Sequence, residues 1–130
     1  SMDAITCLGS LERMLDLEAV LGEINRVARP DSRICFLVRN SETFTWKLMM
    51  EKLGMRNKDG HQGAKSQIAW QALFLENGFH VEQILPDQWP FVRWGQLLSL
   101  GLHKPDPTTI RHGLKPLSQA YEFIFLLRKR

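Results

Sequence analysis

The side chains in this sequence that could bind a metal or move a proton include two cysteines and four histidines. Structural zinc sites place cysteine and histidine ligands at short, regular spacings along the chain. The histidines are His61, His80, His103 and His112. No ligand spacing joins them to one another or to Cys7 and Cys35. We therefore predict no metal site.

Other catalytic patterns are equally sparse. No Ser/His/Asp or paired-carboxylate arrangement can be assembled from the spacing alone. Glu12, Glu42 and Glu51 are therefore interpreted as surface charges rather than general bases. The glycines between positions 54 and 63 are too far apart and follow no strand, so we predict no phosphate-binding loop.

Cysteine and tryptophan side chains each leave two interpretations open. Cys7 and Cys35 fall in apolar runs, where small buried hydrophobes are favoured and reactive thiols are the alternative. Two cysteines make no disulfide framework, so we expect a reducing, cytoplasmic compartment. Trp70, Trp89 and Trp94 lie on or near apolar helical faces, where core packing is the default and the wall of a small-molecule pocket is the alternative.

Composition points to one globular domain. The chain has 130 residues, of which 44% are hydrophobic, and this excludes intrinsic disorder. No apolar run approaches the roughly 20 residues of a membrane-spanning helix. The net charge of +3 is spread along the chain except at Arg128–Arg130, so it is weak evidence for nucleic-acid binding. Residues 1–2 look like an expression scar, and we expect no secretory signal and a native segment from Asp3.

The first half of the chain predicts a strand, a helix and a parallel strand. Residues 4–8 are short, apolar and followed by Gly9, which favours a buried strand. Asp16 is the expected N-cap of an amphipathic helix that ends at Pro30. Residues 34–38 form a continuous apolar strand, as a sheet covered on both faces requires. Together these elements predict a right-handed βαβ unit.

The second half predicts further helices and strands around two polar or irregular segments. We expect a helix from Phe44 that stops at Gly54, and a helix capped by Ser66 that ends at Gly78. A strand over 81–85 should stop at Pro86. The other expected elements are a polar loop over 56–65, an apolar helical stretch over 89–101 and a last strand over 121–127.

The segment Asp3–Arg13, followed by Glu23–Pro30, resembles the class I S-adenosylmethionine-dependent methyltransferases, in particular the type 11 group. Members have an aspartate that opens the fourth strand, a small turn and a Leu-Glu-His step. A helix ending in Glu-(Ile/Met)-x-Arg-Val-x-(Lys/Arg)-Pro then precedes the fifth strand. Here Arg13 replaces the usual histidine, and Asp31 and Ser32 stand where two glycines are common.

The resemblance continues over nearly the whole chain. Trp70–Phe79 resembles the helix and Gly-Phe entry to strand six, and Tyr121–Lys129 resembles the closing antiparallel strand. Residues 42–65 and 86–116 would be variable inserts in a single domain over 3–130. The implied fold is α/β, a partial Rossmann-like sheet of family strands 4 to 7, mostly parallel with an antiparallel last strand and flanking helices.

The resemblance also implies that the chain is the C-terminal half of such a domain. In the family, a glycine-rich turn and an acidic residue of the first half hold most of the cofactor, and neither is found here. We therefore expect S-adenosylmethionine to bind in the complete protein and not to this fragment. Only its methionine end would contact this chain, near Cys7, Leu8, Gly9 and Arg13.

By the same resemblance, the complete protein would be a transferase that methylates a small-molecule acceptor, and this chain alone would be inactive. The expected acceptor-side residues are Trp46, Trp89 and Trp94, with His61 as a candidate base or, alternatively, a solvated loop histidine. A non-catalytic interaction or assembly module is the main alternative. An RNA-directed methyltransferase is a third interpretation that the composition favours little.

A half domain would leave the strand over residues 5–8 with a bare apolar edge, and such edges recruit another chain. We expect this edge to pair with a second copy, as an edge-strand or swapped homodimer, or with the missing N-terminal half. No membrane partner is expected.

Overall fold

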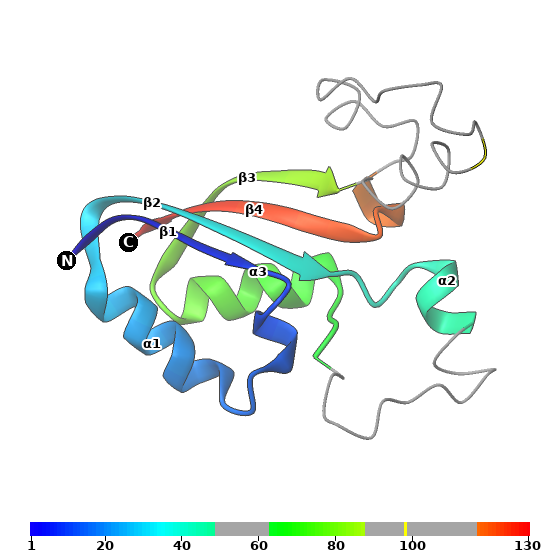
Figure 1. The fold of residues 1–130 in the computed structure, drawn as a ribbon, viewed down its shortest axis with the longest axis horizontal. Helices are drawn as coiled ribbons and strands as arrows, with labels where there is room; N and C mark the ends of the chain where they lie inside the picture. The colour runs from blue at the N-terminus through cyan, green and yellow to red at the C-terminus, as the bar shows by residue number, and fades with distance from the viewer. Residues whose placement is uncertain (49–62, 88–97, 99–116) are drawn as a thin grey trace.

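The computed structural model describes residues 1–48, 63–87, 98 and 117–130. These residues form a four-stranded sheet in the order β1-β2-β4-β3 (Figure 1). The strands are β1 (Met2–Leu8), β2 (Ala28–Arg39), β3 (Phe79–Asp87) and β4 (Glu122–Lys129). β1 and β2 are parallel, and β4 runs antiparallel to both β2 and β3. The predicted parallel βαβ unit and the antiparallel last strand are therefore confirmed.

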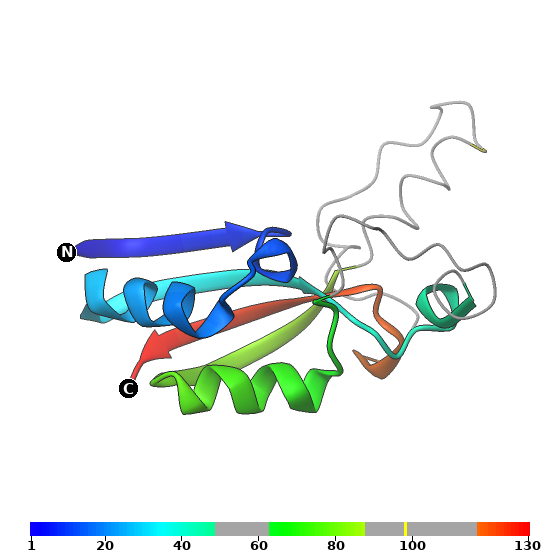
Figure 2. The same cartoon turned by 90° about the horizontal axis from the view of Figure 1, so that it is seen from below.

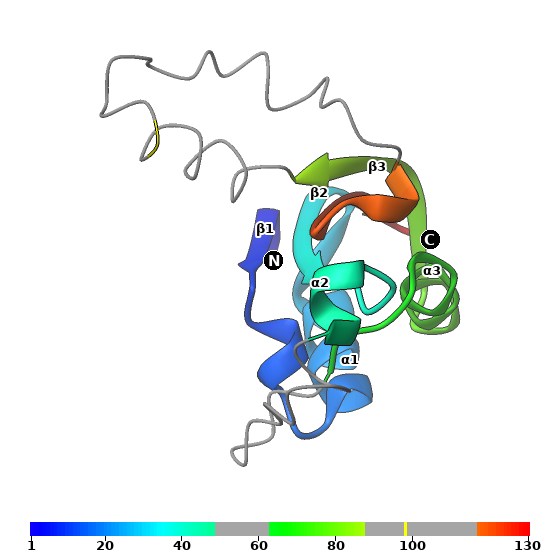
Figure 3. The same ribbon diagram turned by 90° about the vertical axis from the view of Figure 1, so that its right-hand side faces the viewer.

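Two helices, α1 (Leu17–Val27) and α3 (Gln67–Glu76), lie on the same side of the sheet (Figures 1 and 3). Both begin where their caps predict, because Asp16 accepts from the Ala19 N–H and Ser66 accepts from the Ala69 N–H. α3 ends at Glu76, and Gly78 lies just beyond its C-cap with a φ of 81°, the left-handed conformation that glycine tolerates best. The short helix α2 (Phe44–Lys47) and the 3-10 turns η1 (Leu11–Arg13) and η3 (Leu117–Gln119) complete the described elements.

The core lies between the sheet and α1 and α3. Alternate residues of β2 and β4 point toward the helices and are fully buried with Leu21, Trp70 and Phe74. Phe74 lies at the centre of an aromatic cluster, with its ring centroid 5.2 Å from that of Phe36 and 5.1 Å from that of Phe125. Trp70 also donates its indole N–H to the Arg39 carbonyl, so its predicted core position is confirmed.

The opposite side of the sheet, called the open face here, carries side chains that alternate with the core. Cys35, Leu37, Ile124 and Leu126 are only half-buried there. None of the helices among the described residues lies on this face, since α1 and α3 both lie on the other side of the sheet (Figure 1), the side that Figure 2 views. The expectation of a β2 strand covered on both faces is therefore wrong for the described part of the chain.

Two predicted boundaries differ from the structure. α1 ends at Val27 rather than at Pro30, because the Ala28 N–H closes the last turn on the Ile24 carbonyl and Ala28 is already extended. Pro86 does not stop β3, which continues to Asp87. Among the described strands β3 pairs only with β4, and an edge strand tolerates a missing N–H on its free side. The predicted helix after Phe44 is described only as far as α2.

Most of the two predicted inserts, including the apolar stretch over 89–101 apart from residue 98, lies outside the described residues. Within the described part of the chain, no helix combines the length and hydropathy that crossing a membrane would need.

Candidate functional site

The carboxyl ends of the parallel strands β1 and β2 lie side by side. The chain turns after β1 at Gly9, whose φ of 65° favours glycine and whose N–H donates to the Leu37 carbonyl at 3.0 Å. Ligands of open α/β sheets bind outside the carboxyl ends of the strands. The residues predicted to contact the cofactor lie at or just after this turn, and their side chains are not equally exposed. Cys7 is half-buried on the helix side, Leu8 is 61% exposed on the open face, and Arg13 is exposed.

Glu12 is the buried charge of this edge, with 8% of its surface exposed. Its Oε1 accepts a hydrogen bond from the Arg39 N–H at 2.8 Å. The pairing of β1 with β2 ends at Leu37, so this side chain takes the place of a β1 main-chain acceptor. Gly63 lies against the same residue, and a Cβ there would come within 2.7 Å of the Glu12 carbonyl oxygen. The interpretation of Glu12 as a surface charge is therefore wrong, because its backbone position directly behind β1 buries it.

Arg39 at the end of β2 is held between two aromatic rings. Its guanidinium lies 5.4 Å from the ring centroid of Trp46 and 5.5 Å from that of Tyr121. Its Nη2 is 3.5 Å from Oε1 of Glu122, which is 14% exposed. We call Glu12, Arg39, Trp46, Tyr121 and Glu122 the edge cluster. It includes the predicted pocket residue Trp46.

Burial raises the pKa of the Glu122 carboxyl, and the nearby carboxyls of Asp87 and Glu12 act in the same direction. The Arg39 guanidinium opposes them without reversing the direction. A carboxyl with a raised pKa binds its proton more tightly in the folded chain than in the unfolded chain.

This pKa shift predicts a pH-dependent stability. The unfolding free energy should fall as the pH rises from the ordinary glutamate pKa of about 4.3 through the raised pKa of Glu122. Glu122→Gln should remove this part of the fall, so that the variant gains stability relative to the parent above that window. Urea unfolding of both proteins over a pH series measures the difference. A parent that gains stability relative to the variant across the window would contradict the direction.

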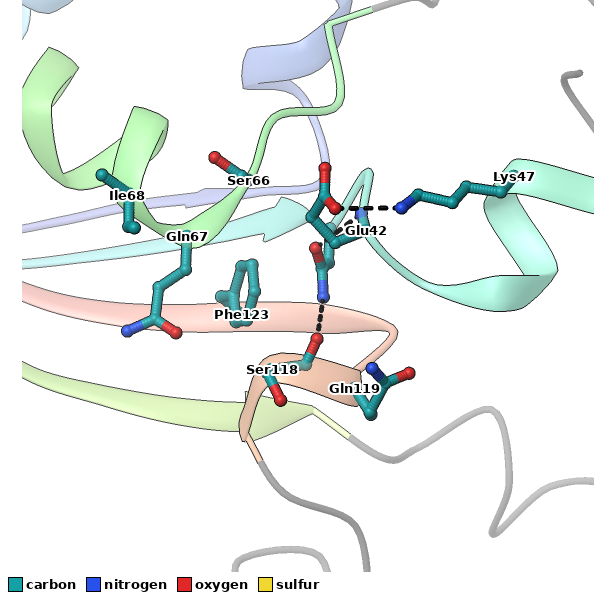
Figure 4. Close-up of a pocket in the computed structure, with 9 residues that line it drawn as sticks. Glu42, Lys47, Ser66, Gln67, Ile68, Ser118, Gln119 and Phe123 are labelled. Atoms are coloured by element: carbon teal, nitrogen blue, oxygen red, sulfur yellow. Dashed lines mark hydrogen bonds and ion pairs between the residues drawn. The ribbon is translucent and has the colours of Figure 1, made fainter.

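Beside the edge cluster, the described residues form a pocket of about 370 Å³, called the edge pocket (Figure 4). Asn40 is buried beneath it and donates from Nδ2 to the Ser118 and Ala120 carbonyls at 3.0 and 2.8 Å. Its Oδ1 accepts from the Glu42 N–H at 2.9 Å. Asn40 therefore joins the end of β2 to the segment that enters β4. The remaining lining residues are Glu42, Lys47, Ser66, Gln67, Ile68, Ser118, Gln119 and Phe123.

The edge pocket is polar at its mouth and apolar at its base. Glu42 and Lys47 form an ion pair of 3.0 Å, and both side chains are about half exposed. Figure 4 shows Gln67 and Ser66 at the start of α3 on one side, and Ser118 and Gln119 of η3 on another. The buried Phe123 lies between them. Such a site suits a small polar molecule.

The two cysteines do not come together. Thr6, rather than Cys7, is the register partner of Cys35, so the two thiols lie on opposite faces of the sheet. Burial raises the pKa of both thiols, which disfavours the reactive thiolate form. Both side chains are half-buried rather than buried, and the raised pKa values favour the unreactive thiol of the two interpretations. Among the described residues, no group of three His, Cys, Asp or Glu side chains could hold a metal ion.

The remaining predicted site residues, His61, Trp89 and Trp94, lie outside the described residues. The sequence predicts no role for Arg39 or Asn40, and it places Glu122 only within the last strand. These residues come to one edge of the sheet only through the fold.

No family model matches this sequence, and no curated protein matches it either. Solved structures do share its fold. The mitomycin 7-O-methyltransferase MmcR superposes with a TM-score of 0.61 at 16% identity, over 100% of this chain and 30% of its own. The described residues therefore share the fold of part of a class I methyltransferase domain.

Two further structures agree with this class I methyltransferase fold. The N,N-8-amino-8-demethyl-D-riboflavin dimethyltransferase RosA of Streptomyces davawensis gives a TM-score of 0.56 at 14% identity, over 100% of this chain and 30% of its own. A chain in the complex of the Haloferax volcanii Trm112 methyltransferase activator gives 0.62 at 14% identity, over 99% of this chain and 54% of its own. The present chain therefore spans about a third to a half of these structures.

The edge pocket is not lined by Cys7, Leu8, Gly9 or Arg13. No turn among the described residues combines several glycines after a strand. A Cβ on Gly9 would meet nothing within 4 Å, so the turn after β1 is open to further chain or ligand.

Proposed function

We propose that this chain is the acceptor side of an S-adenosylmethionine-dependent methyltransferase that acts on a small molecule. The observation that carries the proposal is the edge pocket beside the edge cluster, at the carboxyl ends of β1 and β2 in a methyltransferase fold. Binding sites of open α/β sheets lie at that edge.

The cofactor, when bound in the complete protein, supplies an activated methyl group, so the protein's main task is to align the acceptor in a site that excludes water. Asn40 and Arg39 suit that task because each is held by several partners. Asn40 forms three hydrogen bonds through its side chain, and Arg39 lies between two rings. We propose Trp46 as an acceptor-side residue through its contact with Arg39. His61, Trp89 and Trp94 remain proposals from the sequence.

The open face and the free edge of β1 are the proposed contact surface for a protein partner. Among the described strands, β1 pairs only with β2. A groove of about 430 Å³ on the open face is lined by Thr6, Cys35 and Leu126, with Arg33 and Arg128 beside them. The partner would be the remaining half of the domain or a second copy of this chain. A protein complex among the similar structures supports partner binding in this fold.

The same surface favours a second candidate function, a non-catalytic interaction module built on the methyltransferase fold. An unpaired strand edge binds an extended segment of another chain without any catalytic chemistry. For either function we propose a cytoplasmic location, because both cysteines are free.

A methyl-transfer assay separates the two functions. The full protein product of the source gene and the 130-residue chain would each be incubated with S-adenosylmethionine carrying a labelled methyl group and a library of small acceptors. We expect labelled product from the longer protein and none from the chain alone. A longer protein that binds this chain's partner and transfers no methyl group would support the interaction module instead.

A further inference from the structure

The groove of about 430 Å³ on the open face, called the open-face groove, is hollow because its floor is made of small side chains. Ala4 and Thr6 of β1 point to this face, and the register of β1 and β2 places Thr6 directly beside Cys35. Leu126 of β4 is the register partner of Cys35 on its other side and forms an apolar wall. The open-face groove therefore has room for a bulky apolar side chain from outside.

One end of the open-face groove carries an excess of positive charge, because two arginines and one glutamate line it. The register that pairs Ile34 with Leu127 brings Arg33 beside Arg128, and like charges on neighbouring strands repel each other. Nε of Arg128 lies 2.6 Å from Oε1 of Glu82, which neutralises it. Arg33 is exposed and has no ion-pair partner within the part of the chain that the structure describes. A carboxylate from outside would complete this end of the groove.

The occupant of the groove must satisfy its own main chain. Both β2 and β4 have a paired strand on each side, so their main-chain groups are used within the sheet. The face therefore offers side chains alone, and a segment that covers it needs internal hydrogen bonds, as a helix has. An amphipathic helix also presents apolar residues at every third or fourth position along one side.

Charge disfavours two sources of such a helix or face within this chain. A second copy would bring its own open face, on which Glu122 and Asp87 are largely buried. The apolar segment over 89–101 contains Arg93 and no carboxylate. Neither source matches Arg33. The similar structures extend well beyond the part that this chain covers, so the remainder of the domain is the source that we favour.

We infer that the open-face groove binds an acidic amphipathic helix from the part of the domain that lies outside this chain. A bulky apolar residue of this helix fills the hollow over Thr6 and Cys35, and a nearby aspartate or glutamate pairs with Arg33. The inference rests on the proposed function in taking this chain as part of a larger domain. Docking of the helix needs neither cofactor nor methyl transfer, so its test and the methyl-transfer assay fail independently.

Binding of a synthetic helix to the 130-residue chain tests the inference. The probe is a fluorescein-labelled peptide of about 21 residues that repeats Leu-Glu-Gln-Leu-Leu-Glu-Ala, so that its leucines lie on one side. The matched peptide has lysine in place of every glutamate. Fluorescence anisotropy measures both affinities. We expect saturable binding of the acidic peptide and binding of the basic peptide that is weaker by about tenfold or more.

Two substitutions then test the charge and the hollow. Arg33→Glu should weaken binding of the acidic peptide by about tenfold, a loss of about 1.4 kcal/mol, and should strengthen binding of the basic peptide. Arg26→Glu makes the same change of charge at an exposed position on α1 and should leave the preference unchanged. Ala4→Trp fills the hollow from an exposed position, so it should weaken binding of both peptides. Arg33→Gln repeats the charge test if Arg33→Glu lowers the melting temperature.

Three results would overturn the inference. The absence of saturable binding of the acidic peptide would leave the groove to another part of this chain. An equal loss of affinity in Arg33→Glu and Arg26→Glu would mean that the peptide responds only to net charge. Self-association of the parent chain that Arg33→Glu abolishes, measured by light scattering, would make a second copy the occupant.

Discussion

Phe74→Ala is expected to lower the unfolding free energy by about 3–5 kcal/mol, the usual cost of removing a large aromatic side chain from a core. Phe74 is fully buried and contacts the rings of Phe36, Trp70 and Phe125. It is the side chain through which α3 packs on both central strands. A small domain has only about 5–15 kcal/mol of stability in total, so this single change should bring the chain close to unfolding. Urea denaturation followed by circular dichroism measures the loss.

Phe44→Ala is the matched control, because Phe44 is 73% exposed at the start of α2. It should change the unfolding free energy by less than about 0.5 kcal/mol. Equal effects of the two substitutions would mean that α3 does not pack on the sheet as described.

Thr6→Pro is expected to abolish association through β1 and to leave the sheet itself intact. The Gly9 N–H bonds to the Leu37 carbonyl of β2. Because main-chain groups alternate along a strand, Ile5 and Cys7 point their N–H groups toward β2, and Thr6 points its N–H outward. Proline at Thr6 therefore removes only a donor on the free edge. Light scattering across a micromolar concentration series should show self-association of the parent chain and a monomeric variant.

Ile5→Pro is the informative counterpart. It removes an N–H that points toward β2 and a side chain that packs against the core, so β1 should detach and stability should fall. A parent chain that is monomeric at micromolar concentration would contradict the prediction that the edge of β1 mediates self-association. An associated parent whose association survives Thr6→Pro would place the contact elsewhere.

Much of this fold is predictable from local sequence. The apolar runs of β1 and β2, the caps Asp16 and Ser66, and the left-handed turn at Gly78 each depend on neighbouring residues. These features fixed the βαβ unit and the position of α3. The ends of elements were less predictable, since Pro86 is acceptable in β3 only because tertiary pairing leaves that side of the strand free.

The site is harder to predict because its residues are buried and brought into contact only by the tertiary fold. Glu12 resembles any surface glutamate in sequence, and only the turn after β1 places it under the Arg39 N–H. Arg39 and Glu122 are 83 positions apart and meet through the antiparallel register of β2 and β4. The β2 strand was expected to be covered on both faces, although no described element lies on its open face.

We propose that this chain forms one wall of a methyltransferase site and that the rest of the site lies outside it. Isothermal titration of S-adenosylmethionine into the purified 130-residue chain tests it most directly. We expect no saturable heat at cofactor concentrations up to about 1 mM, which corresponds to binding weaker than about 4 kcal/mol. Saturable, stoichiometric binding at micromolar concentration would contradict the claim, because the chain would then contain a complete cofactor site.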